Sequence, residues 1–239
     1  MKRFTKVIVS ILLMTVVLFT VTCKKNDVGG NDGGGGASDT HAYVDLGLPS
    51  GLLWATCNIG AEKPEECGDY YAWGDTQSKE TYDWSNYRYC NGSYISLTKY
   101  CSNSIFGYNG FTDNLINLLP EDDAATVNWG INWRMPTSEE WQELYNNTTC
   151  MWVTQNGENG RLFTASNGNS VFLPAAGYRC DNSLGDAGSY GGYWSSSLNM
   201  DSPNYAWRFN FGMDYCYGDD YGSARYFGQS VRPVRSSQN

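Results

Sequence analysis

Short apolar runs broken by glycine, proline and asparagine are the feature of this sequence that most restricts its fold. The segment YVDLGLPSGLLWATCNIGA, residues 43–61, predicts a strand, a tight turn and a second strand. Residues 205–211 alternate strictly, which predicts a half-buried strand with its aromatic side chains on one face. That face would carry Tyr205, Trp207, Phe209 and Phe211. Residues 193–197 and 230–234 also have the composition of strands.

A β-hairpin is predicted in the second half of the chain. An Asn167-Gly168 pair separates the runs 162–165 and 171–174, and such a pair is typical of a two-residue hairpin turn. Taken with the other short strands, the hairpin indicates an antiparallel sheet rather than parallel strands joined by helices.

One segment has a clear helical pattern. Thr137 and Glu140 form a capping box, and the apolar residues that follow recur at helical spacing, so a helix is expected from 138 to 147. Residues 112–127 predict two short helical turns broken at Pro120. The predicted fold class is therefore α+β, with a twisted antiparallel sheet, a few short helices and long loops.

The N-terminus has the features of an export signal. Basic residues followed by an uncharged run predict a signal peptide at residues 1–22. The cysteine that follows, Cys23, resembles the acylated cysteine of bacterial lipoproteins, so 23–42 would be a lipidated cysteine and a glycine-rich tether. Residues 43–239 would form a single domain. The expected location is the bacterial outer membrane, anchored by lipid and facing outwards.

The cysteines are expected to cross-link the long loops. Residues 62–111 lack helical periodicity, and we predict a long loop region pinned by Cys67, Cys90 and Cys101. In an exported protein, disulfides Cys57–Cys67 and Cys90–Cys101 would close short loops, whereas in a reducing compartment all would be buried thiols. Three more cysteines lie in the second half: Cys150, Cys180 and Cys216.

Four ordered motifs suggest a family. They are YVDLGLPSGLLWA at 43–55, WRMPTSEEWQEL at 133–144, GYWSSS at 192–197 and SVRPVR at 230–235. In that order they resemble the Fibrobacter succinogenes major paralogous domain family. The resemblance implies a fold similar to the C-type lectin-like and sulfatase-modifying-factor folds, in an exported setting. Fold analogy of this kind points to glycan or protein binding only by association.

The residue types favour binding over catalysis. The chain has one histidine, His41, and contains no sequence motif of a histidine-based triad, a zinc hydrolase or a phosphate loop. We therefore predict no enzymatic activity. A hydrolase using an Asp/Glu pair stays an alternative, as does a structural subunit of a surface assembly. The net charge of −9 disfavours nucleic acid as a partner.

Aromatic residues make up 15% of the chain, and they suit a surface that binds an extracellular glycan or protein. The candidate ligand-binding residues are Trp194, Tyr205, Tyr215, Tyr217 and Tyr221. Trp194 could instead be a core residue whose neighbouring serines bond to the backbone. No cofactor is required, although calcium is possible, with candidate ligands in the C-terminal loops. These are Asp201, Asn204, Asp214, Asp219 and Asp220.

Overall fold

The structure is a computed structural model that describes residues 41–217 and 222–237. The predicted signal peptide, Cys23 and the greater part of the predicted tether lie outside the described residues. Within the described ranges, no helix is both long enough and apolar enough to cross a membrane. Most of the regular structure is antiparallel sheet with a few short helices, as expected of an α+β fold.

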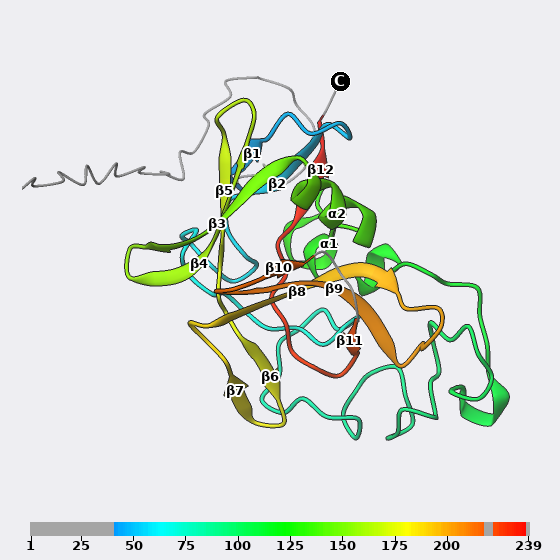
Figure 1. The fold of residues 1–239 in the computed structure, drawn as a ribbon. Helices are drawn as coiled ribbons and strands as arrows, with labels where there is room; N and C mark the ends of the chain where they lie inside the picture. The colour runs from blue at the N-terminus through cyan, green and yellow to red at the C-terminus, as the bar shows by residue number, and fades with distance from the viewer. Residues whose placement is uncertain (1–40, 218–221, 238–239) are drawn as a thin grey trace, which may run out of the picture.

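The domain begins and ends in the same sheet (Figure 1). β1 (Tyr43–Asp45) pairs antiparallel with β2 (Leu52–Ala55), and β2 pairs antiparallel with β12 (Val234–Ser236). The strand, turn and strand predicted for residues 43–61 are confirmed. Because β2 lies between the first and last strands, the two ends of the domain are fixed close together.

The second sheet is a three-stranded meander of β3 (Thr148–Gln155), β4 (Glu158–Ala165) and β5 (Ser170–Pro174). Asn156 and Gly157 connect β3 to β4, and both have positive φ angles, of 50° and 93°. That combination defines the tight hairpin turn that Asn-Gly pairs favour. This turn was not among the predicted ones, although its dipeptide is the same as the one at 167–168.

The hairpin predicted around Asn167-Gly168 is present, but its turn is longer than expected. The N–H of Ala165 donates to the carbonyl of Asn169, which leaves three residues, 166–168, in the loop. Gly168 takes a positive φ of 86°. Three-residue loops of this kind place a glycine in the left-handed region after a type I turn, so the glycine was located correctly and the loop length was wrong.

The third sheet is built on the long pair β8–β9, and a small hairpin lies beside it (Figure 1). The sheet contains β8 (Tyr190–Leu198), β9 (Tyr205–Gly212), β10 (Cys216–Tyr217) and β11 (Ser223–Ala224). The hairpin consists of β6 (Tyr178–Cys180) and β7 (Ser183–Gly185). The predicted strands at 193–197 and 205–211 are thus confirmed, whereas residues 230–233 run beside β8 as irregular chain before β12.

Burial along β9 follows the predicted alternation only at one end. Phe209 and Phe211 are fully buried, whereas Trp207 is half-buried and Tyr205 is exposed. Ala206, on the face expected to be polar, is fully buried. The reason is that β8 and β9 are covered on both faces, so a single apolar face could not describe the strand.

Two clusters of buried side chains cover these two faces. The tyrosine cluster contains Tyr70, Tyr71, Trp73, Tyr82, Tyr87, Tyr89, Tyr100 and Trp194 among its members. The second cluster contains Trp54, Trp141, Phe163, Tyr193, Phe209 and Phe211 among its members. Tyr193 and Trp194 are adjacent on β8 and enter different clusters, as alternation along a strand requires.

The helices are short. They are the 3₁₀ turns η1 (Tyr108–Gly110) and η2 (Pro120–Asp122) and the helices α1 (Ala124–Trp129) and α2 (Ser138–Asn146). The capping box of α2 is present as predicted. The first of the two helical turns predicted at 112–127 is absent: residues 112–119 are irregular, and helical structure starts at Pro120 because proline suits a first helical position.

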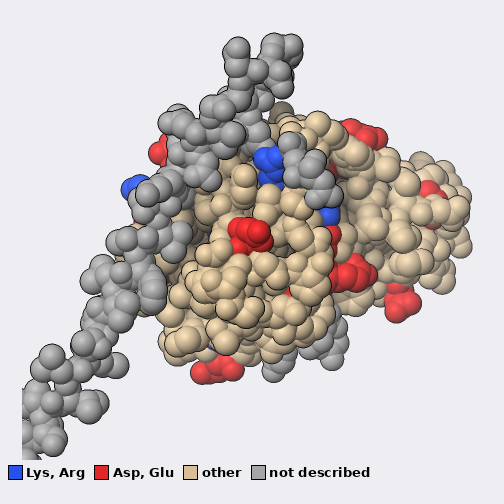
Figure 2. All heavy atoms as spheres, turned by 90° about the horizontal axis from the view of Figure 1, so that it is seen from above, with Lys and Arg blue, Asp and Glu red and all other residues tan. Residues whose placement is uncertain are grey.

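Contacts with the domain begin two residues earlier than predicted. His41, assigned to the tether, stacks on Trp129 with ring centroids 3.8 Å apart. The carbonyl of Ala42 accepts a hydrogen bond from Thr56. On the face shown in Figure 2, charged side chains are sparse and scattered, as the 17% of charged residues would suggest.

Candidate functional site

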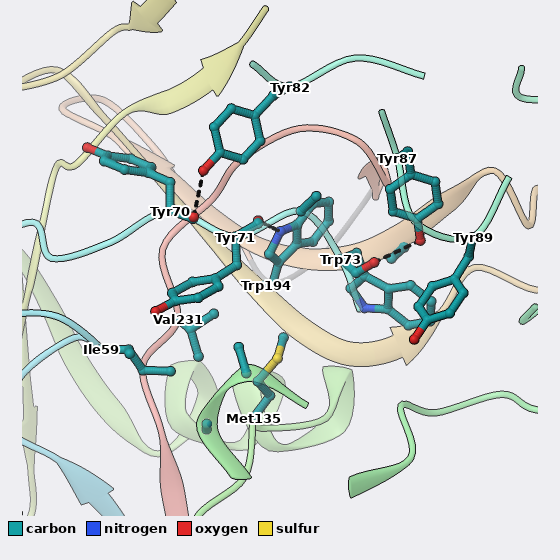
Figure 3. Close-up of a cluster of buried hydrophobic side chains, with 14 of the residues drawn as sticks. Ile59, Tyr70, Tyr71, Trp73, Tyr82, Tyr87, Tyr89, Met135, Trp194 and Val231 are labelled. Carbon is teal, nitrogen blue, oxygen red and sulfur yellow. Dashed lines mark hydrogen bonds between the residues drawn. The ribbon is translucent and has the colours of Figure 1, made fainter. Parts of the chain in front are cut away.

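The irregular segment from 68 to 89 is held by tyrosine hydroxyls that bond to the main chain (Figure 3). The hydroxyl of Tyr82 donates to the carbonyl of Tyr70 at 2.7 Å, and that of Tyr87 donates to the carbonyl of Trp73 at 2.7 Å. Tyr82 also exchanges two main-chain hydrogen bonds with Asp181, in the β6–β7 turn. These bonds satisfy buried carbonyls that have no sheet partner, so the segment is ordered without regular structure.

Arg225 also holds the segment from 68 to 89 in place. Its side chain is fully buried, and its guanidinium carbon lies 4.9 Å from the ring centroid of Trp73 and 5.1 Å from that of Tyr87. Its nitrogens donate to the Tyr87 hydroxyl and to three main-chain carbonyls. The carbonyls belong to Lys99, Tyr100 and Pro203. A buried guanidinium with this many acceptors ties the loops to the sheet.

The predicted disulfides are absent. The structure shows no disulfide among the seven cysteines that it describes. The thiol of Cys90 donates to the carbonyl of Trp84, and that of Cys101 donates to the carbonyl of Asn103. The prediction that cysteines pin residues 62–111 is therefore wrong in this structure, because buried tyrosines and Arg225 supply the cross-links instead.

A buried carboxylate, that of Asp122, contacts Tyr89 at the end of this segment. Asp122 is 1% exposed and accepts hydrogen bonds from the hydroxyls of Tyr89 and Tyr100 and from the ammonium of Lys99. Burial alone would raise the pKa of Asp122, but these hydrogen bonds outweigh it and hold the pKa below its usual range. Burial raises the pKa of both tyrosines, so they stay protonated and donate.

Two adjoining hollows open beside this segment, and we call them together the polar cleft. The first has a volume of about 440 Å³ and is lined by Asp75, Thr76, Gln77, Ser78, Lys79 and Arg88. The second has a volume of about 430 Å³. It is lined by Gly68, Asp69, Tyr70, Ser78, Lys79, Glu80, Tyr82, Arg179 and Asn182. Ser78 and Lys79 belong to both, so the hollows meet at these two residues.

Asp75 and Lys79 form an ion pair in the wall of the polar cleft, with 2.8 Å between Oδ2 and Nζ. Asp75 is 9% exposed, and its Oδ1 is buried with no hydrogen-bond partner among the described residues. Burial raises the pKa of Asp75, while Lys79 opposes that rise. A buried acceptor without a partner is uncommon in folded proteins and is one mark of a place where a ligand or ion binds.

The charges of the polar cleft cancel. Its acidic residues are Asp69, Asp75 and Glu80, and its basic residues are Lys79, Arg88 and Arg179. Cationic residues are few in a chain with a net charge of −9, so their meeting here sets this surface apart. Such a lining offers many donors and acceptors without attracting one sign of charge.

The aromatic residues predicted to bind ligand do not form one surface. Trp194 is fully buried, and its indole N–H donates to the carbonyl of Tyr71 (Figure 3), so it belongs to the core. Tyr205 is exposed at the start of β9, whereas Tyr215 follows the end of that strand. An eight-residue strand spans roughly 25 Å, which separates these two. The side chain of Tyr217 and the whole of Tyr221 lie outside the described residues.

The candidate calcium ligands are divided in the same way. Asp201 is exposed and Asn204 is buried before β9, whereas Asp214 is exposed after it. Asp219 and Asp220 lie outside the described residues. Among the residues that the structure describes, no group of three or more acidic, histidine or cysteine side chains could hold a metal ion. The predicted set therefore cannot surround one calcium ion, because β9 holds its members apart.

A further hollow is lined by aromatic rings. Tyr178, Tyr190, Phe227 and Arg208 enclose about 240 Å³ on the side of the β6–β7 hairpin. The guanidinium carbon of Arg208 lies 5.7 Å from the ring centroid of Tyr190. No local sequence pattern indicates this hollow, since its four residues come from four separate segments: β6, β8, β9 and the chain after β11.

The structure is thus a mainly antiparallel-sheet domain whose irregular loops form the polar cleft. A family model described as a domain of unknown function, DUF8237, matches residues 151–235. The match begins in β3 and ends in β12, so it includes the β8–β9 sheet and leaves out the segment from 68 to 89. No curated protein and no solved structure matches the chain.

Proposed function

We propose that this domain binds an uncharged, hydroxyl-rich extracellular ligand, a neutral glycan, in the polar cleft. The observation that carries the proposal is the composition of the cleft, which is rich in donors and acceptors and has equal numbers of acidic and basic residues. Each hollow is within the range of roughly 300–1,000 Å³ that small-ligand sites occupy. A ligand that displaces water from such walls must replace its hydrogen bonds, and sugar hydroxyls both donate and accept.

The role is that of a capture protein on the cell surface. In this proposal residues 1–22 are removed, Cys23 carries lipid, and the domain faces outwards from the outer membrane. We also propose that the fold is C-type lectin-like and that the chain is related to the Fibrobacter succinogenes major paralogous domain family. The pairing of terminal strands through β2 and the long ordered loops support this fold.

Glycan-array screening of the full-length protein in detergent, followed by titration of the strongest ligand, tests the proposal. We expect neutral glycans to bind, and we expect Arg179→Ala and Gln77→Ala each to weaken binding about tenfold, the effect of losing roughly 1.4 kcal/mol. Lys63→Ala is the matched control, because Lys63 is exposed and lies outside the cleft. Binding that survives both cleft variants but is lost in Tyr205→Ala would show that the ligand binds elsewhere.

One observation favours a second function, hydrolysis of the glycan. Burial raises the pKa of Asp75, and a general acid needs a carboxyl group with a raised pKa. Asp69 and Glu80 line the adjoining hollow and could supply the second carboxylate. Release of reducing sugar by the wild type, and its loss in Asp75→Asn, would establish the hydrolase. Binding without turnover would support the capture role.

A further inference from the structure

Two cysteines from different sheets meet at one junction. Cys150 lies on β3 and Cys216 lies on β10, and their Sγ atoms are 2.7 Å apart. Both side chains are half-buried. Local spacing in the sequence favours other pairs, because 66 positions separate these two cysteines.

Arg161 holds the same junction. From β4 its side chain donates to the carbonyls of Gly212, Met213 and Tyr215, which form the turn between β9 and β10. This clamp positions the turn, and with it Cys216, against the β3–β4–β5 sheet. The guanidinium also lies beside Cys150, where its positive charge favours a thiolate.

The two thiols have different acidities. The hydrogen bond between the two thiols is the main cause that lowers the pKa of Cys150, burial opposes it, and the charge of Arg161 adds to it. The pKa of Cys216 is raised, first because of its hydrogen bond with Cys150 and then because of burial. Cys150 is therefore the thiol that ionises first and attacks, and Cys216 is the one that follows.

We propose that Cys150 and Cys216 form a disulfide in the exported protein, by exchange with an oxidant that itself carries a disulfide. The Cys150 thiolate attacks one sulfur of the oxidant, forms a mixed disulfide and expels a thiolate. Cys216 then loses its proton and attacks the Cys150 sulfur, which expels the second thiolate. Two electrons pass from the cysteine pair to the oxidant, and one disulfide replaces another.

The disulfide would join the β3–β4–β5 sheet to the β8–β9 sheet at the place where Arg161 already joins them. Neither cysteine lines the polar cleft, so the disulfide does not depend on the proposed ligand. Closing a loop of this length restricts the unfolded chain, and that restriction stabilises the fold.

Peptide mapping of the full-length protein tests the proposal directly. Thiols are blocked with iodoacetamide as the cells are lysed, and the digest is analysed without reductant. We expect one cross-linked peptide pair that contains Cys150 and Cys216 and lacks two hydrogen atoms. In a second arm, reduced protein is exposed to oxidised glutathione, and we expect the same pair to form with release of reduced glutathione. Iodoacetamide adducts on both residues in protein taken from cells would overturn the proposal.

Thermal unfolding provides a second readout. Dithiothreitol should lower the Tm of the wild type by roughly 5–15 °C, the effect of losing a stabilising disulfide in a domain of this size. Cys150→Ser and Cys216→Ser should each have a Tm that no longer responds to dithiothreitol. Cys180→Ser is the matched control, because Cys180 is half-buried and its Sγ lies near Asp181 and Tyr226, and it should respond as the wild type does. An equal response in all four proteins would overturn the proposal.

Discussion

Three buried tyrosine hydroxyls of the segment from 68 to 89 donate to main-chain carbonyls, in place of the main-chain hydrogen bonds that a regular strand would make. Tyr82 and Tyr87 donate to carbonyls of the segment itself, and Tyr70 donates to the carbonyl of Ala176. A phenol suits this role because its ring fills the core while its hydroxyl reaches a polar group. The tyrosines of this segment are thus used inside the domain, where they order the loops that form the polar cleft.

At the residue scale, Asp122 makes stability depend on pH. Asp122→Asn removes a buried charge that accepts from Lys99 and two tyrosines, and it should lower the free energy of unfolding by about 2 kcal/mol at pH 7. The pKa of Asp122 is lowered in the folded state, so this stabilisation is present above the ordinary aspartate pKa of about 3.9 and is lost as the pH falls through the folded-state pKa.

Urea unfolding at pH 7 and at about pH 2 measures this effect, because the lower pH protonates ordinary carboxyl groups. The difference between wild type and Asp122→Asn should shrink at the acidic pH. Asp186→Asn, at an exposed site, controls for the change in net charge. A difference of the same size at both pH values would show that shape, and not charge, gives Asp122 its role.

At the scale of the element, α2 depends on its N-terminal cap. The Thr137 hydroxyl accepts from the N–H of Glu140, and the Glu140 carboxylate accepts from the N–H of Thr137. Glu140 also forms an ion pair with Arg134, at 2.5 Å. These bonds position a nine-residue helix whose Trp141 and Leu144 are fully buried. A helix this short is not stable alone, so its cap and its packing must act together.

Thr137→Ala should lower the free energy of unfolding by about 1 kcal/mol, because an N–H at the start of the helix loses its acceptor. Thr137→Ser keeps the hydroxyl and should stay within a few tenths of a kcal/mol of the wild type. Equilibrium denaturation of the three proteins measures both differences. If serine costs as much as alanine, the methyl group of Thr137, and not its hydroxyl, is what stabilises the helix.

At the scale of the whole molecule, the proposed function depends on lipid attached to Cys23. Cells grown with labelled palmitate should label the wild type, whereas Cys23→Ser should carry no label. More than one acyl chain is needed for stable anchoring, so the unlabelled variant should also leave the membrane fraction. Cys67→Ser is the control and should stay labelled. A wild-type protein that has no label and keeps residues 1–22 would contradict the lipoprotein proposal.

None of the binding residues predicted from the sequence lines the polar cleft. Lys79 and Arg88 are nine positions apart and Arg179 lies on β6, so no local pattern brings them together. The aromatic prediction was wrong for Trp194 because composition indicates how many rings a chain has and not which side of a sheet they face. The candidate calcium ligands on either side of β9 do not meet, because nearness in sequence is lost when an extended strand separates its two ends.

Local patterns alone determined several strands, among them β1, β2, β8 and β9, the helix predicted at 138–147 with its capping box, and the glycine at the β4–β5 turn. They did so because turns, caps and strand alternation depend on neighbours in the chain. Only the tertiary structure decided that β8 and β9 are buried on both faces, that tyrosines and Arg225 order the loops, and that Cys150 meets Cys216. Those outcomes depend on which distant segments pack together in the core, and neighbours in the chain do not determine that packing.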